Sequence, residues 1–461
     1  MNYNELRKRH PVFYYHDYEI IEEENEIQVR FDFEIEGLSY FNPSFLLRKP
    51  ADSDGIAELE LFREAAFSLG LAELVSYWKL TCAPTVVIEA GYLEEEQIRW
   101  WKKLYFNGLR DFFRTNGILT DAENFMALRS AGSSIGGRPD IRTYHGNLIP
   151  VGGGRDSFVS MEVLSSMKQE NHAFVINYVM SAIHSAEAAG YRGDRLIVAE
   201  RTLDARMLDF NKQGYLNGTT PFNALTAFAA YLTAVVWGKK YICLSIEAGS
   251  DEDDGDDALS QMYSKTIGFE KDFHSYTETY LSRMISCFSL LRPLSELQIT
   301  GIFSNYRQYH RVFRSCNVGA KTETWCAHCG RCLYVGVMLS AFLDDEQLNA
   351  IFGRDMLNDP DMMSLFEQQT GMCEGQPQGL PGSSREEINT AVCMSVKAHQ
   401  KAGKELPLLY RQYISTPNYE YYRDRTGILK AWNDDNLVPE EYRKLVREKL
   451  EEIHYGYESM D

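Results

Sequence analysis

One stretch of the sequence decides the fold, and it runs Leu148-Ile149-Pro150-Val151-Gly152-Gly153-Gly154-Arg155-Asp156-Ser157. Its apolar start predicts a short strand, and residues 157–168 have helical spacing. Three glycines between the two let the backbone bend without side chains in the way, so that successive amide N–H groups can face an anion. The helix that follows adds its N-terminal partial positive charge. The stretch therefore predicts a phosphate-binding loop between a strand and a helix.

The polar side chains of this loop each have a candidate role beside a phosphate. Asp156 is suited to hold Mg²⁺, and the Ser157 hydroxyl can donate to a phosphate oxygen. Arg155 is expected to face the phosphates, with a surface salt bridge as the alternative. The spacing differs from the Walker pattern, which has a longer spacer and ends in Gly-Lys-Ser/Thr. A glycine-rich turn without a ligand is the other interpretation of the stretch.

The loop resembles the PP-loop of the ATP pyrophosphatase superfamily, whose usual form is Ser-Gly-Gly-x-Asp-Ser. Gly152 stands here in place of the first serine. The resemblance implies that residues 152–157 bind ATP with Mg²⁺. It also implies that ATP is cleaved between its α- and β-phosphates, so that a substrate oxygen receives AMP and pyrophosphate leaves.

Strand-like and helical segments alternate after the loop. Strands are expected at residues 174–178, 196–198 and 241–245, and a helix at 224–237. This alternation predicts an α/β fold, a parallel sheet with helices on both faces, in which ligands bind beyond the carboxyl ends of the strands.

Three regions are expected along the chain. Residues 1–140 are predicted to form an α+β N-terminal domain, with strand-like alternation over 18–45 and a strand at 85–88. Residues 147–335 are predicted to form the ATP-binding α/β domain. Residues 336–461 are expected to be mainly helical. The acidic run at 250–257 is interpreted as a solvated loop, with a metal site as the alternative.

The charge balance and the hydropathy favour a small-molecule substrate in the cytoplasm. The chain has 47 Lys and Arg against 66 Asp and Glu, the opposite of the basic footprint typical of nucleic-acid binding. No apolar run reaches the roughly 18 residues that span a bilayer. Residues 1–10 are polar and charged, without the apolar core of a signal peptide. We therefore expect neither a nucleic-acid partner nor a membrane.

Four cysteines form a tight cluster at Cys316, Cys326, Cys329 and Cys332. In a cytosolic protein, such crowding indicates metal ligation rather than disulfides. Four thiolates complete the tetrahedral shell of Zn²⁺ and leave no open position, so the predicted site is structural. His328 is an alternative ligand, and buried free thiols are the other interpretation. The arrangement also looks like the zinc cluster of 7-cyano-7-deazaguanine synthase, another PP-loop enzyme.

Longer stretches narrow the resemblance to one family. Residues 71–79, 105–109, 209–218, 288–297, 315–332 and 351–359 resemble the ATP-dependent UDP-N-acetylmuramoyl-L-alanyl-L-glutamate epimerases. The similarity covers roughly residues 65–400. It implies inversion of the terminal L-glutamate of a peptidoglycan precursor to D-glutamate, with ATP consumed to AMP and pyrophosphate. The alternatives are a PP-loop enzyme of nucleoside or tRNA modification and a nucleotide-sensing protein without turnover.

Candidate catalytic residues follow from chemistry and position. Glu247 follows the expected fourth strand, Arg292 can hold a carboxylate or pyrophosphate, and the Cys373 thiol can serve as an epimerase base. The non-functional alternatives are an ordinary loop charge for Glu247, a structural ion pair for Arg292 and a buried structural thiol for Cys373. Arg201, after the third strand, and Arg354 are equally ambiguous. The pattern does not identify the two acid/base groups of an epimerase.

Overall fold

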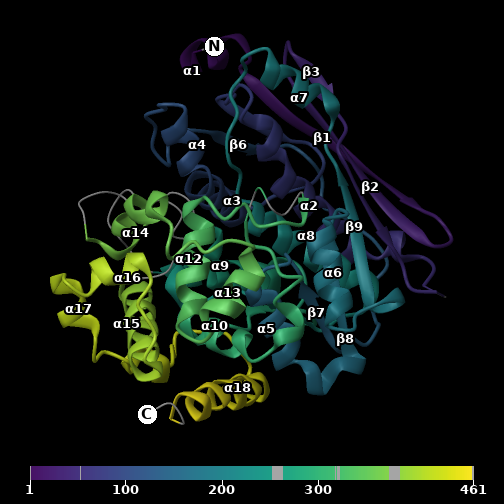
Figure 1. Cartoon of the computed structure of the whole chain (residues 1–461). Coiled ribbons are helices and arrows are strands. Elements are labelled where there is room, and N and C mark those ends of the chain that lie inside the picture. Colours follow the sequence, from purple (N-terminus) through teal and green to yellow (C-terminus); the bar gives the residue numbers. More distant parts are fainter. Residues whose placement is uncertain are drawn as a thin grey trace.

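The computed structural model describes residues 2–51, 53–251, 263–316, 318, 322–372 and 385–458 (Figure 1). Cys373 and residues 252–257 of the acidic run lie outside these ranges.

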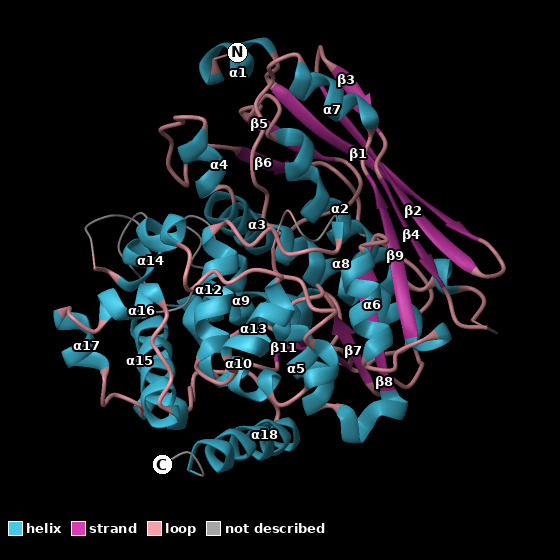
Figure 2. Ribbon diagram, viewed as in Figure 1, coloured by secondary structure: helices cyan, strands magenta, loops and turns pink. Residues whose placement is uncertain are grey.

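One mixed sheet runs through the described part of the chain (Figure 2). Its strands are β1 (Val12–Glu22), β2 (Glu26–Ile35), β3 (Ser39–Phe41), β4 (Ser44–Arg48), β5 (Thr85–Ile88), β6 (Ala127–Ser130), β7 (Asn147–Pro150), β8 (Asn171–Ile176), β9 (Leu196–Thr202), β10 (Tyr241–Leu244) and β11 (Ser286–Ser289). They lie in the order β11-β10-β7-β8-β9-β4-β2-β1-β5-β6, and β3 pairs with β2. The expected α/β class is therefore confirmed.

The expected parallel sheet is confined to one half of this larger sheet. Strands β11, β10, β7, β8 and β9 are parallel. Strand β4 then joins β9 in antiparallel register, with Ser44 opposite Thr202 and Leu47 opposite Ala199. The N-terminal strands thus extend the parallel sheet beyond β9, where the sequence suggested a separate unit. The boundaries at residues 140 and 335 stay predictions.

Helices pack against the sheet in the described part of the chain, and strands β1 and β2 lie at one edge of the molecule (Figure 1). They are α1 (Tyr3–Arg9), α2 (Glu60–Trp78), α3 (Glu95–Gly108), α4 (Arg110–Thr115), α5 (Arg155–Val163), α6 (Met180–Ala188), α7 (Ala205–Lys212), α8 (Phe222–Trp237), α9 (Ile267–Tyr280), α10 (Glu296–Ser304), α12 (Gly330–Ser340), α13 (Asp345–Phe352), α14 (Met363–Thr370), α15 (Arg385–Ala402), α16 (Leu408–Tyr413), α17 (Pro417–Tyr422) and α18 (Glu440–Glu458). None of them is long and apolar enough to cross a membrane within the described residues.

Both faces of the parallel strands are covered, as the sequence predicted. Side chains alternate between the faces of a strand, and Leu148 of β7 joins one buried cluster while Ile149 joins another. The first cluster contains α2, α8 and α9 residues, and the second contains residues of α5, α10 and α12. Continuous apolar runs such as Leu148–Ile149 therefore reflect burial on both sides of the sheet.

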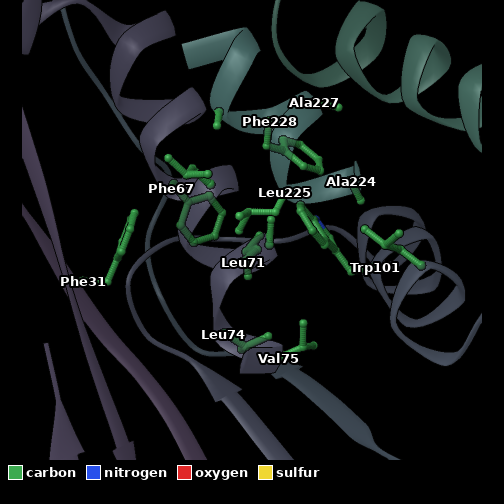
Figure 3. Packing of buried hydrophobic residues seen from close by; sticks show 14 of the residues in the cluster. Phe31, Phe67, Leu71, Leu74, Val75, Trp101, Ala224, Leu225, Ala227 and Phe228 are labelled. Carbon is green, nitrogen blue, oxygen red and sulfur yellow. The ribbon is translucent and has the colours of Figure 1, made fainter. Parts of the chain in front are cut away.

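Helices α2 and α8 form the contact that packs the N-terminal region against the parallel strands. Figure 3 shows Phe67 and Leu71 of α2 facing Leu225 and Phe228 of α8, with Trp101 of α3 beside them. All five side chains are buried. Helix α2 is apolar around most of its circumference, which is typical of a helix enclosed on several sides.

The expected strands at 85–88, 174–178, 196–198 and 241–245 are confirmed within a few residues as β5, β8, β9 and β10. Strand β11 was not expected, because its four residues Ser-Cys-Phe-Ser carry too short a pattern to indicate a strand. Its pairing with β10 buries it, and the register is set by tertiary contacts.

The C-terminal helix α18 is anchored to the central strand of the parallel sheet. The Tyr442 hydroxyl donates to Oδ1 of the buried Asn147 at 2.6 Å. The Tyr442 ring, itself fully buried, packs 5.2 Å from the Tyr241 ring and 5.3 Å from the Phe288 ring between centroids. The end of the chain therefore closes the face of the sheet beside β7, β10 and β11.

This anchor makes a prediction about stability. Tyr442→Ala removes a buried aromatic ring and leaves Asn147 with an unsatisfied oxygen, so we expect the free energy of unfolding to fall by about 3–5 kcal/mol. Urea unfolding measures the loss. Tyr92→Ala, at a tyrosine that is 52% exposed, is the matched control and should change it by no more than about 0.5 kcal/mol. Equal midpoints for the two variants would contradict the docking of α18.

Candidate functional site

The glycine loop lies where the strand order of the parallel sheet reverses. Numbered by their order in the chain, the strands β9, β8, β7, β10 and β11 follow the spatial order 3-2-1-4-5. The chain leaves β7 in one direction along the sheet and returns to place β10 on its other side. Open α/β sheets bind ligands in the crevice at such a point, beyond the carboxyl ends of the strands. The loop follows β7, and Glu247 follows β10.

The backbone of the loop requires glycine at Gly153. Its φ is +85°, a conformation that side-chain-bearing residues rarely adopt. A methyl group there would lie 3.0 Å from the carbonyl carbon of Ser181, in the first turn of α6. At Gly152 a methyl group would meet no atom within 4 Å, and this residue is exposed. The loop is thus pressed against α6 at one glycine and open at the preceding one.

Arg155 and Ser157 turn toward the protein rather than toward the mouth of the loop. The Arg155 guanidinium is buried, donates to Thr300 Oγ1 at 2.6 Å and lies 3.6 Å from a carboxylate oxygen of Glu296, both on α10. We expected this guanidinium to face phosphate, and the apolar surroundings of α5 and α10 leave its charge paired with Glu296 instead. The Ser157 hydroxyl donates to the Gly154 carbonyl at 2.9 Å.

Three carboxyl groups gather beside the loop. Oδ1 of Asp156 is buried and has no hydrogen-bond partner within the described residues. Burial raises the pKa of Asp156; the Arg155 charge opposes this shift and the Glu247 charge adds to it. Burial likewise raises the pKa of Glu296 to about 7. Carboxylates that repel one another in a buried space are suited to hold a divalent cation, which favours their charged forms.

The cationic residues expected at the sheet edge are mostly engaged by protein groups. Arg292 is fully buried, and its guanidinium donates to a Glu270 carboxylate oxygen at 3.1 Å and to the carbonyls of Glu247 at 2.7 Å and Lys265 at 2.6 Å. This arrangement is the structural ion pair that the sequence analysis gave as the alternative to a ligand-binding role for Arg292. Arg201 makes the same kind of pair, with two hydrogen bonds of 2.7 Å to Glu73 of α2.

The four cysteines converge as their spacing predicted. Their sulfur atoms all lie within 4.8 Å of one another, with 3.5 Å between Cys316 and Cys326, between Cys326 and Cys332, and between Cys329 and Cys332. A tetrahedral zinc site with roughly 2.3 Å bonds has sulfur–sulfur edges of about 3.8 Å, so the group fits a single Zn²⁺. His328 instead accepts a hydrogen bond from Arg354 at 2.6 Å.

Sequence reasoning missed Glu296, Lys265 and Arg331, which the fold brings to the loop. The charges of Lys265 and Arg331 both lower the pKa of Asp156. Glu296 lies 140 residues after Asp156 in the sequence, and its local pattern indicates only a helix start, the Ser295–Gln298 capping box. Arg331 lies inside the cysteine motif, and this position was the one feature of the sequence that could have indicated a role for it.

Two family models match the chain. The chain matches the model of the MurL N-terminal domain over residues 4–290 and that of the MurL C-terminal domain over residues 312–419. No solved structure matches it.

Three relatives carry the name UDP-N-acetyl-alpha-D-muramoyl-L-alanyl-L-glutamate epimerase. The protein of Xanthomonas oryzae pv. oryzae is 25% identical over 75% of this chain and 78% of its own length. That of Salinispora tropica is 26% identical over 80% of each chain. That of a Micromonospora species is 25% identical over 89% of this chain and 91% of its own. Since the first family model alone covers more than half of the sequence, the chain belongs to the MurL family.

Proposed function

We propose that this protein inverts the terminal L-glutamate of UDP-N-acetylmuramoyl-L-alanyl-L-glutamate to D-glutamate, with ATP consumed to AMP and pyrophosphate. The names of the three relatives support the substrate and the epimerisation. The observation that carries the use of ATP is the glycine loop at the reversal of strand order, with Asp156 buried beside it.

The need for ATP follows from the acidity of the glutamate α-proton. A free carboxylate holds that proton tightly, because its removal would build a second negative charge beside the first. In the proposed reaction a carboxylate oxygen attacks the α-phosphorus of ATP, and the bond to pyrophosphate breaks. The resulting acyl-adenylate has lost the carboxylate charge and delocalises the carbanion. One base removes the α-proton, an acid on the other face returns one, and water then releases AMP.

The loop and its neighbours supply binding and positioning in this scheme. The backbone amides after Gly152 and the start of α5 would hold phosphate oxygens. Asp156 and Glu247 would hold Mg²⁺, which neutralises charge on the phosphates. The Arg155–Glu296 contact fixes the first turn of α5 against α10 and so positions Asp156. We propose in addition that the four cysteine thiolates hold a structural Zn²⁺, since four sulfurs leave no open position.

The cysteine group gives the first of three predictions about the proposed function. Purified protein should hold about one Zn²⁺ per chain, measured by elemental analysis, and Cys332→Ser should lose it because three sulfurs no longer close the shell. Cys82→Ala, at a buried cysteine outside the group, should keep the metal. Absence of metal, together with four freely titratable thiols in the native protein, would contradict the assignment.

The second prediction concerns Asp156. Asp156→Asn keeps the shape of the side chain but removes the charge that holds Mg²⁺, so pyrophosphate release should fall by at least about 100-fold. Thermal unfolding should be unchanged or shifted upward, because a buried charge has been removed. Asp209→Asn, at an exposed residue of α7, should retain full activity. An Asp156→Asn enzyme within a few-fold of the wild type would disprove the role of the loop.

The third prediction concerns the reaction. In deuterated water, label should enter the α-position of the terminal glutamate only when ATP and Mg²⁺ are both present, because adenylation must precede proton removal. Mass spectrometry of the substrate and product measures the label, alongside AMP and pyrophosphate. An ATP analogue that cannot break its α,β-bond should give neither label nor inversion.

Exchange without ATP would show that the nucleotide is regulatory. Pyrophosphate release with another acid, without exchange at glutamate, would indicate the nucleoside-modification alternative.

A further inference from the structure

We propose that Arg331 binds the phosphate chain of the nucleotide, and that the metal-loaded cysteine group holds it in place. This inference rests on the proposed use of ATP and adds a residue that lies outside the glycine loop. Arg331 is in the first turn of α12, between Cys329, the residue that precedes the helix, and Cys332.

The backbone around Arg331 is tied to the cysteine group and to a neighbouring helix. The Leu333 amide donates to the Cys329 carbonyl at 3.1 Å, and Gln369 of α14 donates to the Gly330 carbonyl at 2.7 Å. Arg331 therefore sits on a short, fixed piece of backbone whose two flanking sulfurs, those of Cys329 and Cys332, are 3.5 Å apart. The place from which its side chain extends is therefore fixed relative to the cysteine group.

Residues 314–316, which end at the first cysteine of the group, contact the glycine loop. The Arg314 amide donates to the Gly153 carbonyl at 2.8 Å. A methyl group placed on Gly154 would lie 3.4 Å from the Ser315 hydroxyl oxygen. Cys316 follows directly, and its sulfur lies 3.5 Å from that of Cys326. One metal ion bound to the four sulfurs would thus join the segment on the loop to the segment that carries Arg331.

Arg331 and Asp156 have complementary unsatisfied groups. The Nε of Arg331 is buried and, within the described residues, has no hydrogen-bond partner, as is also the case for Asp156 Oδ1. The two are near enough for the Arg331 charge to lower the pKa of Asp156, yet the described part of the chain contains no ion pair between them. Buried polar atoms without partners are rare and call for a ligand or another explanation. A phosphate with its cation between them would satisfy both.

Arg155 Nε also has no hydrogen-bond partner within the described residues, but the terminal guanidinium nitrogens of Arg155, Arg292 and Arg354 are already engaged by protein groups. The Arg155 guanidinium is bound to Thr300 and beside Glu296, Arg292 is bound to Glu270, and Arg354 to His328 and Asp359. A guanidinium matches the oxygens of a phosphate with parallel hydrogen bonds, which a carboxylate partner would otherwise occupy. Arg331 is therefore the arginine whose surroundings best fit an incoming polyphosphate.

The test is titration calorimetry of the full-length, metal-loaded protein with MgATP and, separately, with AMP. Arg331→Ala should weaken MgATP binding by about 10–100-fold, the effect of one lost charged hydrogen-bonding group, and should change AMP binding far less. Arg331→Lys keeps the positive charge but loses the two parallel N–H donors of the guanidinium. Its MgATP affinity should therefore lie between that of the wild type and that of Arg331→Ala. Arg354→Ala removes an arginine that contacts His328 within the cysteine motif, and this variant should bind MgATP within about twofold of the wild type.

The outcomes separate this inference from the function on which it rests. Arg331→Ala that binds MgATP like the wild type overturns the inference and leaves the proposed function intact. Wild-type protein that does not bind MgATP overturns both.

Folded but metal-free Cys332→Ser should lose MgATP affinity as Arg331→Ala does, and unchanged affinity would remove the role given to the metal. If Cys332→Ser does not fold, partial metal removal by a chelator is the substitute, with MgATP affinity expected to follow metal content.

Discussion

The close approach of Gly153 to the start of α6 is the constraint on which the site depends. Strand β7 lies between β8 and β10, and the chain that leaves it turns within residues 151–154 before α5 begins. The φ of +85° at Gly153 makes that turn, and its carbonyl receives the Arg314 amide. A side chain at this position would push against the backbone of Ser181 and Ala182 in α6. This turn sets where α5 begins, and the Arg155 contacts with α10 then hold its first turn in place.

Around this turn the protein buries charges at a cost to stability. Arg155, Glu296 and Glu247 are each no more than 4% exposed, and desolvation of such groups exceeds their mutual attraction unless the geometry is favourable. The raised pKa of Glu296, to about 7, is a measure of that cost. An apolar pair would hold α5 to α10 with less penalty. Keeping charges here makes sense when the same space must accept a cation and a triphosphate, because a bound Mg²⁺ relieves the repulsion among the carboxyls.

Local patterns in the sequence were sufficient for the loop and for the cysteine group. The run Gly152–Gly154 and the spacing of Cys326, Cys329 and Cys332 are short-range features, and each is recognisable without knowledge of the fold. Pairing of β4 with β9 joins residues more than 150 positions apart, and the sequence of residues 44–48 does not indicate which strand they pair with. The direction of Arg155 was equally inaccessible, because it depends on Thr300 and Glu296 across the interior. What escaped prediction is non-local in each case.

The place of the cysteine group follows from what surrounds it. Arg314 and Ser315 lie beside the loop, and in our proposal the Arg331 guanidinium faces the space where phosphates would lie. Among the described residues of the segment 314–332, Trp325 and Ala327 pack into the second buried cluster beside the four cysteines. Metal–sulfur bonds give order to a short segment without a large core, and they do so without competing for the phosphate-facing groups. In our proposal, metal–sulfur bonds thus position this segment as the close backbone contact between Gly153 and α6 positions the loop.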